Sequence, residues 1–272
     1  MGVVFMTAGS HVVKLTAKTA LKNNWLKCIF AFLTPIFCFF VLIFSADYIS
    51  YISNDAAAYV LLAVMLIFIL MPLLLGTVRF FWRMIFGADD RQAALFYYFS
   101  EKQKYKRALQ MAAALALRGI GFGIILFSPA LIVDIFSGVK FYDLINMPIP
   151  IWTGNLYYIS AFLKAAASVL LFFIMSKYYL APFLIVADEN MEVAEAIHMS
   201  CTVARNTILD YIGLLFSFFG WILISFFIFP LVFTMPYFMT SLCVHVRFAV
   251  ADYNKRVEKS TENSFPTYAA GI

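Results

Sequence analysis

Apolar runs long enough to cross a lipid bilayer set the strongest constraint on how this chain folds. The hydrocarbon core of a bilayer is about 30 Å thick, so a helix that rises about 1.5 Å per residue needs about 20 apolar residues to span it. Runs of this length recur along the chain, and the last of them, residues 211–246, is long enough for two crossings. With 64% hydrophobic and 13% charged residues, the chain also exceeds the apolar content typical of water-soluble domains. The sequence therefore predicts an all-α fold, a polytopic bundle of membrane helices.

Six membrane-spanning segments are predicted, and together they form one domain over residues 25–252. Pro230 and Pro236 lie in the middle of the last apolar run and are predicted to mark the hairpin between the fifth and sixth spans. Residues 1–24 precede this domain, and residues 253–272 follow it as a polar tail that is expected to be disordered. The four spans before the hairpin are predicted at residues 26–45, 57–78, 108–130 and 159–184.

Lysine and arginine residues are distributed unevenly between the two sides of this topology. Most of the 20 in the chain lie before the first span, between the second and third, between the fourth and fifth, or after the sixth. The loops of the opposite side hold only Lys140. Because cytoplasmic loops are enriched in lysine and arginine, the sequence predicts a multi-pass protein of the cell (cytoplasmic) membrane with both termini in the cytoplasm.

The segments outside the spans also carry recognisable patterns. Residues 11–24 place apolar side chains at helical spacing with lysines on the opposite face, which predicts a cytoplasmic helix lying in the membrane interface. Residues 79–107 and 187–207 are predicted to be further cytoplasmic segments that contain helices. The outer loop at residues 134–158 is aromatic and nearly uncharged. This composition favours a loop that rests on the outer leaflet over a lid that covers an outward cavity.

Several short motifs occur in an order that resembles a known family. They are AKTALKNNWLKCI, ALFYYF, YYLAPFLIVADE, EVAEAIHMS, GLLFSFFGWILIS and the dipeptide Pro236-Tyr237. Together they resemble an uncharacterised bacterial family of six-helix integral membrane proteins, the domain of unknown function 975 type. The last hairpin is shorter and the outer loop longer than in the family pattern. The resemblance implies a protein of the bacterial inner membrane, and it brings no activity, cofactor or catalytic residue with it.

Arg118 is the charge that lies deepest in a predicted span. Ala114 and Gly121 lie on the same helical face as Arg118, and these small residues would let a neighbouring helix come close. Gly119 and Gly123 add a GxxxG motif on an adjacent face, a motif that often marks helix packing. Arg118 is therefore expected to face protein rather than lipid. If the hydrocarbon begins near Ala108, Arg118 lies about 15 Å deep. If it begins near Ala112, Arg118 lies about 9 Å deep and its side chain can snorkel to the headgroups.

Two interpretations of Arg118 follow from its depth. A lone arginine at the bilayer centre costs at least about 2.5–3.5 kcal/mol, so a deep Arg118 needs a partner. Asp210, at the cytoplasmic end of the fifth span, is the nearest carboxylate on this topology. The first interpretation is a snorkelling or packed side chain, and the second is a contact with an anion, a lipid headgroup or a substrate. The first is favoured.

A basic cluster precedes the third span. Basic clusters beside a span can bind anionic lipid, but they can also serve only to orient the span, and the second interpretation is favoured. Lys164, within the fourth span, is expected to snorkel. The cluster that forms the candidate contacts with anionic lipid consists of Lys102, Lys104, Lys106 and Arg107.

The sequence contains no spacing typical of catalysis or metal binding. The motifs HExxH, GxSxG and GxxxxGK[ST] are absent, and the four cysteines and three histidines are scattered. No basic patch typical of nucleic-acid binding is present either. An enzyme without a recognisable motif is the least favoured class, and no cofactor, metal or nucleic-acid partner is expected.

Two non-enzymatic functions remain. One is a membrane-embedded accessory or interaction protein that contacts anionic lipid, a partner membrane protein or a second copy of itself. The other is a transporter or permease subunit with an intramembrane cavity near Arg118. Transporters usually place polar or charged residues in several spans. Only Arg118 stands out in this way here, so the accessory function is favoured.

Overall fold

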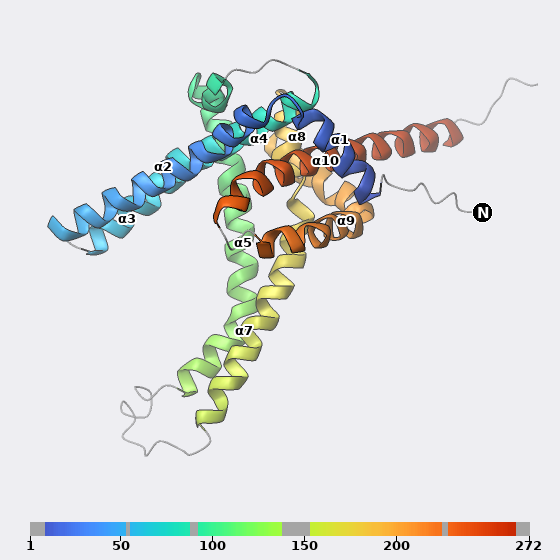
Figure 1. The fold of residues 1–272 in the computed structure, drawn as a ribbon. Helices are drawn as coiled ribbons and strands as arrows, with labels where there is room; N and C mark the ends of the chain where they lie inside the picture. The colour runs from blue at the N-terminus through green and yellow to red at the C-terminus, as the bar shows by residue number, and fades with distance from the viewer. Residues whose placement is uncertain (1–8, 53–54, 88–91, 138–152, 225–227, 265–272) are drawn as a thin grey trace, which may run out of the picture. The chain divides into compact units, whose positions relative to one another are not determined.

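The computed structural model describes residues 9–52, 55–87, 92–137, 153–224 and 228–264 (Figure 1). Every regular element within these ranges is helical, which confirms the all-α prediction. Five described segments are long and apolar enough to cross a membrane, as expected of a helical membrane protein. The fifth of the six predicted crossings, at the start of residues 211–246, is not among them and stays a prediction. The five segments are Trp25–Tyr51, Ala56–Ile85, Lys102–Phe136, Asn155–Ala187 and Pro230–Glu258.

The chain divides into two compact units. The larger unit combines residues 1–112 with residues 180–272, and the smaller unit is residues 113–179. Helix α5 (Lys102–Ser137) begins in the larger unit and continues into the smaller one. The predicted single domain is therefore built from two units, each with its own packing.

The N-terminal half of the larger unit is a set of helices around α4. Helix α2 runs beside α3 and α4, and the short helix η2 packs on α4 (Figure 1). Helices α3 and α4 are joined through the π-helical turn η1, so that they form one continuous helical segment, long and apolar enough to cross a membrane. The elements are α1 (Ser10–Leu21), α2 (Trp25–Ile52), α3 (Asp55–Met65), η1 (Leu66–Leu70), α4 (Met71–Ile85) and the 3₁₀ helix η2 (Gln92–Phe99).

The π-helical turn interrupts the regular hydrogen bonding of this segment, because a wider turn disturbs the main-chain hydrogen bonds around it. The carbonyl of Phe68, which lies in the turn, accepts a hydrogen bond from the hydroxyl of Tyr105 on α5 at 2.8 Å. Beside the turn lies a groove of about 300 Å³ whose lining includes Pro35 of α2, Leu70 of η1 and Met239. Its lining is apolar apart from Thr77, whose hydroxyl donates to a carbonyl of its own helix. The groove therefore suits hydrocarbon chains rather than a polar solute.

The C-terminal half of the larger unit consists of α8 (Ala181–Ala187), α9 (Val193–Ile224) and α10 (Ile228–Ser264). The prediction that Pro230 and Pro236 mark the hairpin is wrong, because α9 ends at Ile224 and α10 has already begun at Ile228. Pro230 occupies the first turn of α10, where a backbone N–H has no hydrogen-bond partner within the helix and proline is therefore tolerated. Pro236 lies inside α10. Helix α10 also continues to Ser264, so residues 253–264 of the expected disordered tail are helical, and residues 265–272 lie outside the described residues.

Helix α1 has the predicted amphipathic pattern, but its apolar stripe is covered by protein. Val13 and Ala17 are buried against Leu214 and Phe218 of α9 and Val244 of α10. The stripe is therefore covered by protein, and the location of residues 11–24 in the membrane interface stays a prediction.

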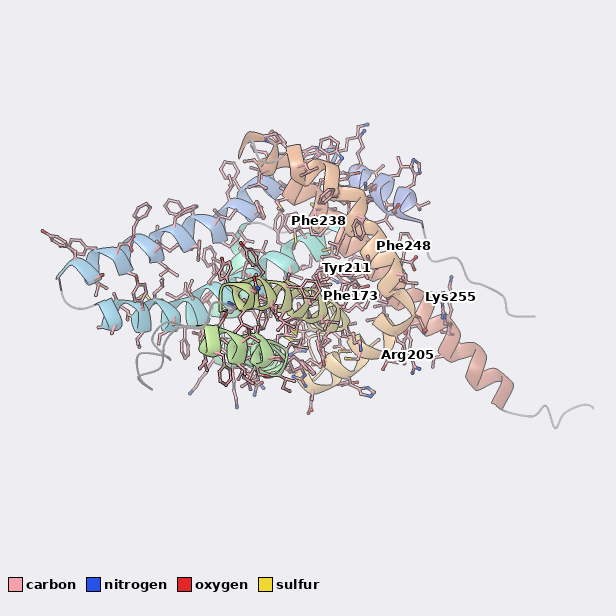
Figure 2. The ribbon with its side chains drawn as sticks, turned by 90° about the horizontal axis from the view of Figure 1, so that it is seen from below. Phe173, Arg205, Tyr211, Phe238, Phe248 and Lys255 are labelled. Atoms are coloured by element: carbon pink, nitrogen blue, oxygen red, sulfur yellow. The ribbon has the colours of Figure 1, made fainter. Side chains whose placement is uncertain are left out.

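Two hydrogen bonds and two more aromatic side chains complete the packing of α1 against α9 and α10. The Nζ of Lys14 donates to the carbonyl of Ser217 at 2.8 Å, and the hydroxyl of Tyr237 donates to the carbonyl of Lys14 at 3.3 Å. Phe238 and Phe248 of α10, both labelled in Figure 2, pack against the same cluster. Helix α1 is thus part of the folded core of the larger unit.

The smaller unit is an antiparallel hairpin of α5 and α7 (Thr153–Met175), and the short helix η3 (Ser176–Tyr178) follows α7. Gly119 lies close to Met175, such that a Cβ at the glycine would be 3.6 Å from the Met175 Cε. Further along, the hydroxyl oxygen of Ser160 lies 3.4 Å from the carbonyl oxygen of Ala130. The first contact joins the start of the hairpin segment of α5 to the end of α7. The second joins the later turns of α5 to the early turns of α7, as an antiparallel pair requires. Much of the predicted outer loop, residues 138–152, lies outside the described residues.

Candidate functional site

A close approach of two main chains builds the polar centre of the larger unit. A Cβ placed on Gly76 of α4 would lie 1.9 Å from the carbonyl oxygen of Leu95 in η2. Only glycine allows η2 to lie this close to α4, because no side-chain carbon fits at that distance. This contact brings Tyr97 and Tyr98 of η2 beside Arg79, one turn further along α4.

Arg79 is the buried cation of this centre, with 6% of its surface exposed. Its Nη2 lies 2.7 Å from Oε1 of Glu189, and its Cζ lies 3.5 Å from the centre of the Tyr97 ring. Its Nε has no hydrogen-bond partner among the described residues. A buried charge of this kind is tolerated only when it is paired, so the contact with Glu189 is what allows Arg79 to be buried at the end of a membrane helix.

The pKa values of Glu189, Tyr97 and Tyr98 in this centre are all shifted away from neutral pH. The hydrogen bond from Tyr97, followed by the contact with Arg79, lowers the pKa of Glu189. Burial raises the pKa of Tyr97, and the neighbouring Glu189 adds to the effect. Burial also raises the pKa of Tyr98 to about 12. At neutral pH the centre is therefore a carboxylate, a guanidinium and two neutral phenols.

Arg107, one of the four predicted lipid-contacting cations, holds the loop that carries Glu189. Its Nη2 donates to the carbonyl of Asp188 at 2.8 Å, and its guanidinium also donates to the carbonyls of Glu189 and Met191. The Asp188 side chain in turn accepts the N–H of Asn190 at 2.8 Å. Arg107 thus closes the turn after α8 and positions the carboxylate that neutralises Arg79.

The other three cations of the predicted cluster differ in their surroundings. The Nζ of Lys104 lies 2.6 Å from Oε1 of Glu101 and 4.3 Å from the centre of the Tyr97 ring. Lys102 and Lys106 are exposed on the first turns of α5. The structure therefore separates the cluster into two cations that join the polar centre and two that point outward.

Arg118 lies in the smaller unit, and its side chain turns back along α5. Its Nη1 donates to the carbonyl of Ala114, one turn earlier, at 2.8 Å, and its Cζ lies 5.7 Å from the centre of the Tyr178 ring. Helical side chains lean toward the N-terminus of their helix, so the guanidinium is displaced toward Lys102 and away from the apolar centre of α5. Gly119, next to it, faces α7, whereas nothing lies within 4 Å of a Cβ placed on Gly123.

A second polar group lies at the other end of the hairpin, and the sequence analysis missed it. Asp134 Oδ2 lies 2.7 Å from the Nζ of Lys164, and the Ser160 hydroxyl donates to Oδ1 of the same carboxylate. Lys164, which was expected to snorkel alone, has an anionic partner. Asp134 had been assigned to the outer loop, but it lies in the last turns of α5.

Asp210 lies in α9 of the larger unit, so the predicted pairing with Arg118 of the smaller unit stays a prediction. Within its own unit, Asp210 acts electrostatically on His245 of α10, which is 4% exposed. Among the described residues, no group of three or more His, Cys, Asp or Glu side chains is placed to hold a metal ion.

Sequence reasoning missed Arg79, Tyr97 and Glu189 for a simple reason. Arg79 and Glu189 lie in different helical segments, 110 residues apart in the chain, and no local spacing links them. The available signal was the pair of tyrosines in ALFYYF after an arginine-bearing helix, together with a carboxylate that follows a predicted helix. No family model matches the chain, and neither the curated proteins nor the solved structures contain a match to it.

Proposed function

We propose that this protein is a non-enzymatic accessory protein, of the domain of unknown function 975 type, in the bacterial cytoplasmic membrane. It crosses the membrane several times, and both termini lie in the cytoplasm. It contacts lipid and a partner membrane protein through the α5–α7 hairpin. The observation that carries the proposal is that this hairpin forms a unit of its own whose apolar side chains are exposed.

One face of α5 is suited to a partner helix. Leu117, Ile124 and Leu131 follow at intervals of seven residues, which places them on one helical face, and they are 70%, 65% and 55% exposed. Gly119 and Ala130 lie toward α7 instead. The hairpin thus uses one face of α5 for its own packing and leaves a continuous apolar face for a neighbour in the bilayer.

The polar centre around Arg79 supports a non-enzymatic role. General acid–base catalysis works best with groups whose pKa lies near the working pH. The pKa of Glu189 is lowered and the pKa values of Tyr97 and Tyr98 are raised, so all three move away from neutrality. The centre behaves as a fixed connection between α4, η2 and the turn after α8. The apolar groove beside η1 likewise suits lipid more than a transported polar solute.

Photo-crosslinking in the native membrane tests this proposal. A photoreactive amino acid is placed at Leu117, Ile124 or Leu131, and at Ile125 as the control. Ile125 is 68% exposed but is turned by about 100° from Ile124. We expect one protein adduct of constant mass from the first three positions and little from Ile125.

The opposite pattern would contradict the proposal. Lipid adducts alone at all four positions would mean that no protein docks on this face. A transport function would then be supported if the protein, reconstituted in vesicles, moved a solute.

A further inference from the structure

The hairpin carries charged residues at two levels, with an apolar stretch between them. On α5, Arg118 and Asp134 are 16 residues apart, which corresponds to about 24 Å along the helix. From Lys164 on α7 to Lys177 in η3 the distance is 13 residues, or about 20 Å. The stretches 119–133 and 165–176 contain no charged residue. Both helices therefore define the same apolar band, bounded at one end by Arg118 and Lys177 and at the other by Asp134 and Lys164.

This band fits the hydrocarbon core when the end residues reach outward. Hydrocarbon is about 30 Å thick, so a band of this length leaves a few ångströms at each end, which long side chains can cover by snorkelling. The Arg118 side chain reaches in the required direction, because it bonds to the carbonyl of Ala114. Tyr178 lies against it, and tyrosines are enriched at the level of the headgroups. Arg118 and Tyr178 are thus placed at one membrane surface.

The two levels differ in how their charge is balanced. At one level, Lys164 is neutralised by Asp134 at 2.7 Å. At the other, Arg118 makes one hydrogen bond to a neutral carbonyl and lies 5.7 Å from an aromatic ring. A guanidinium has five N–H donors, and within the described part of the hairpin no carboxylate bonds to this one. The guanidinium of Arg118 therefore has N–H donors and a positive charge with which it can bind an anion from outside the hairpin.

We propose that Arg118 binds the phosphate of an anionic phospholipid at the Tyr178 end of the hairpin. Arginine suits this ligand because its planar donors match two phosphate oxygens at once. The inference rests on the proposed function, in that it requires the hairpin to cross the bilayer, and it assigns the chemistry of the lipid that the hairpin contacts. An inorganic phosphate ion offers the same oxygens, so the experiment must distinguish the two sources.

The test uses the full-length protein reconstituted in vesicles of phosphatidylcholine and phosphatidylglycerol. After gentle release into detergent, native mass spectrometry counts the phosphatidylglycerol molecules retained per protein. We expect Arg118→Gln to weaken retention by about 10- to 100-fold, the range for loss of a hydrogen bond to a charged group. Arg118→Lys should retain an intermediate amount. The control is the double variant Asp134→Asn with Lys164→Gln, which removes the paired charges at the other level and should retain lipid as the unmodified protein does.

Three results would overturn the inference. The first is unchanged retention in Arg118→Gln, and the second is an equal loss in the control. The third is displacement of the lipid by inorganic phosphate in an Arg118-dependent way, which would make the ligand a free anion. Crosslinking from Ile124 is independent of this measurement, so a failure here and a failure of the proposed function can be told apart.

Discussion

The pairing of Arg79 with Glu189 leads to a measurable coupling in stability. Arg79 is buried, whereas the Glu189 side chain is 53% exposed. Breaking a fully buried ion pair costs about 3–5 kcal/mol, and an exposed pair contributes about 0–1 kcal/mol. A pair with one buried and one half-exposed member falls between these limits. We therefore expect Glu189→Gln to lower the free energy of unfolding by about 2 kcal/mol, because it leaves the buried guanidinium without a counter-ion.

The same substitution should cost far less when the buried charge is already gone. In an Arg79→Met background, Glu189→Gln should lower the free energy of unfolding by about 0.5 kcal/mol, so the coupling between the two positions is about 1.5 kcal/mol. Denaturant unfolding of the four proteins in one detergent measures this coupling. The matched control is the pair Glu101 and Lys104, which joins neighbouring turns at the start of α5 and should couple by less than about 0.5 kcal/mol. Additive effects at Arg79 and Glu189 would refute the reasoning.

Three further predictions concern the same polar centre. Gly76→Ala should destabilise the protein by at least about 1–3 kcal/mol, because its Cβ would meet the main chain of η2 at 1.9 Å; Gly121→Ala, with nothing within 4 Å, should leave unfolding nearly unchanged. The pKa of Glu189 is lowered from its ordinary 4.5. Its contribution to stability should therefore be complete above that pH and be lost as the pH falls through the lowered pKa, and unfolding of Glu189→Gln should lack this dependence. Arg107→Lys removes the forked donor that holds three carbonyls, so amide hydrogen exchange over residues 188–192 should accelerate about tenfold. Lys106→Ala, an exposed neighbour, should leave that exchange unchanged.

The membrane helices were predictable because hydropathy and helix length are local properties. The presence of long apolar helices follows from runs of apolar residues that no soluble fold could bury, whereas their ends do not, since α5 covers Lys102–Ser137 and the predicted third span covers only residues 108–130. The location of the last turn was not predictable in this way, because Pro230 is accepted in the first turn of a helix as readily as in a loop. The stripe of α1 was also ambiguous, since Val13 and Ala17 would look the same whether they packed on lipid or on Phe218.

The candidate site was predictable only where one helix determines it. The backward direction of the Arg118 side chain follows from the geometry of helical side chains, whereas snorkelling, the favoured interpretation of Arg118, stays a prediction. The pairing of Arg79 with Glu189 depends on how η2 packs on α4, which in turn depends on the lack of a side chain at Gly76. Such a contact between distant segments leaves no periodic signal in the sequence. Asp134 was missed because α5 extends further than its hydropathy indicates.

Native mass spectrometry of the protein, purified gently from its own membrane, shows whether a membrane protein is bound to the hairpin. We expect a stoichiometric complex with a membrane protein, which can be a second copy of this chain, and the complex should be lost when Leu117 and Ile124 are both replaced by alanine. Recovery of the protein alone, with a water-soluble small molecule bound, would contradict the accessory function and support a transporter.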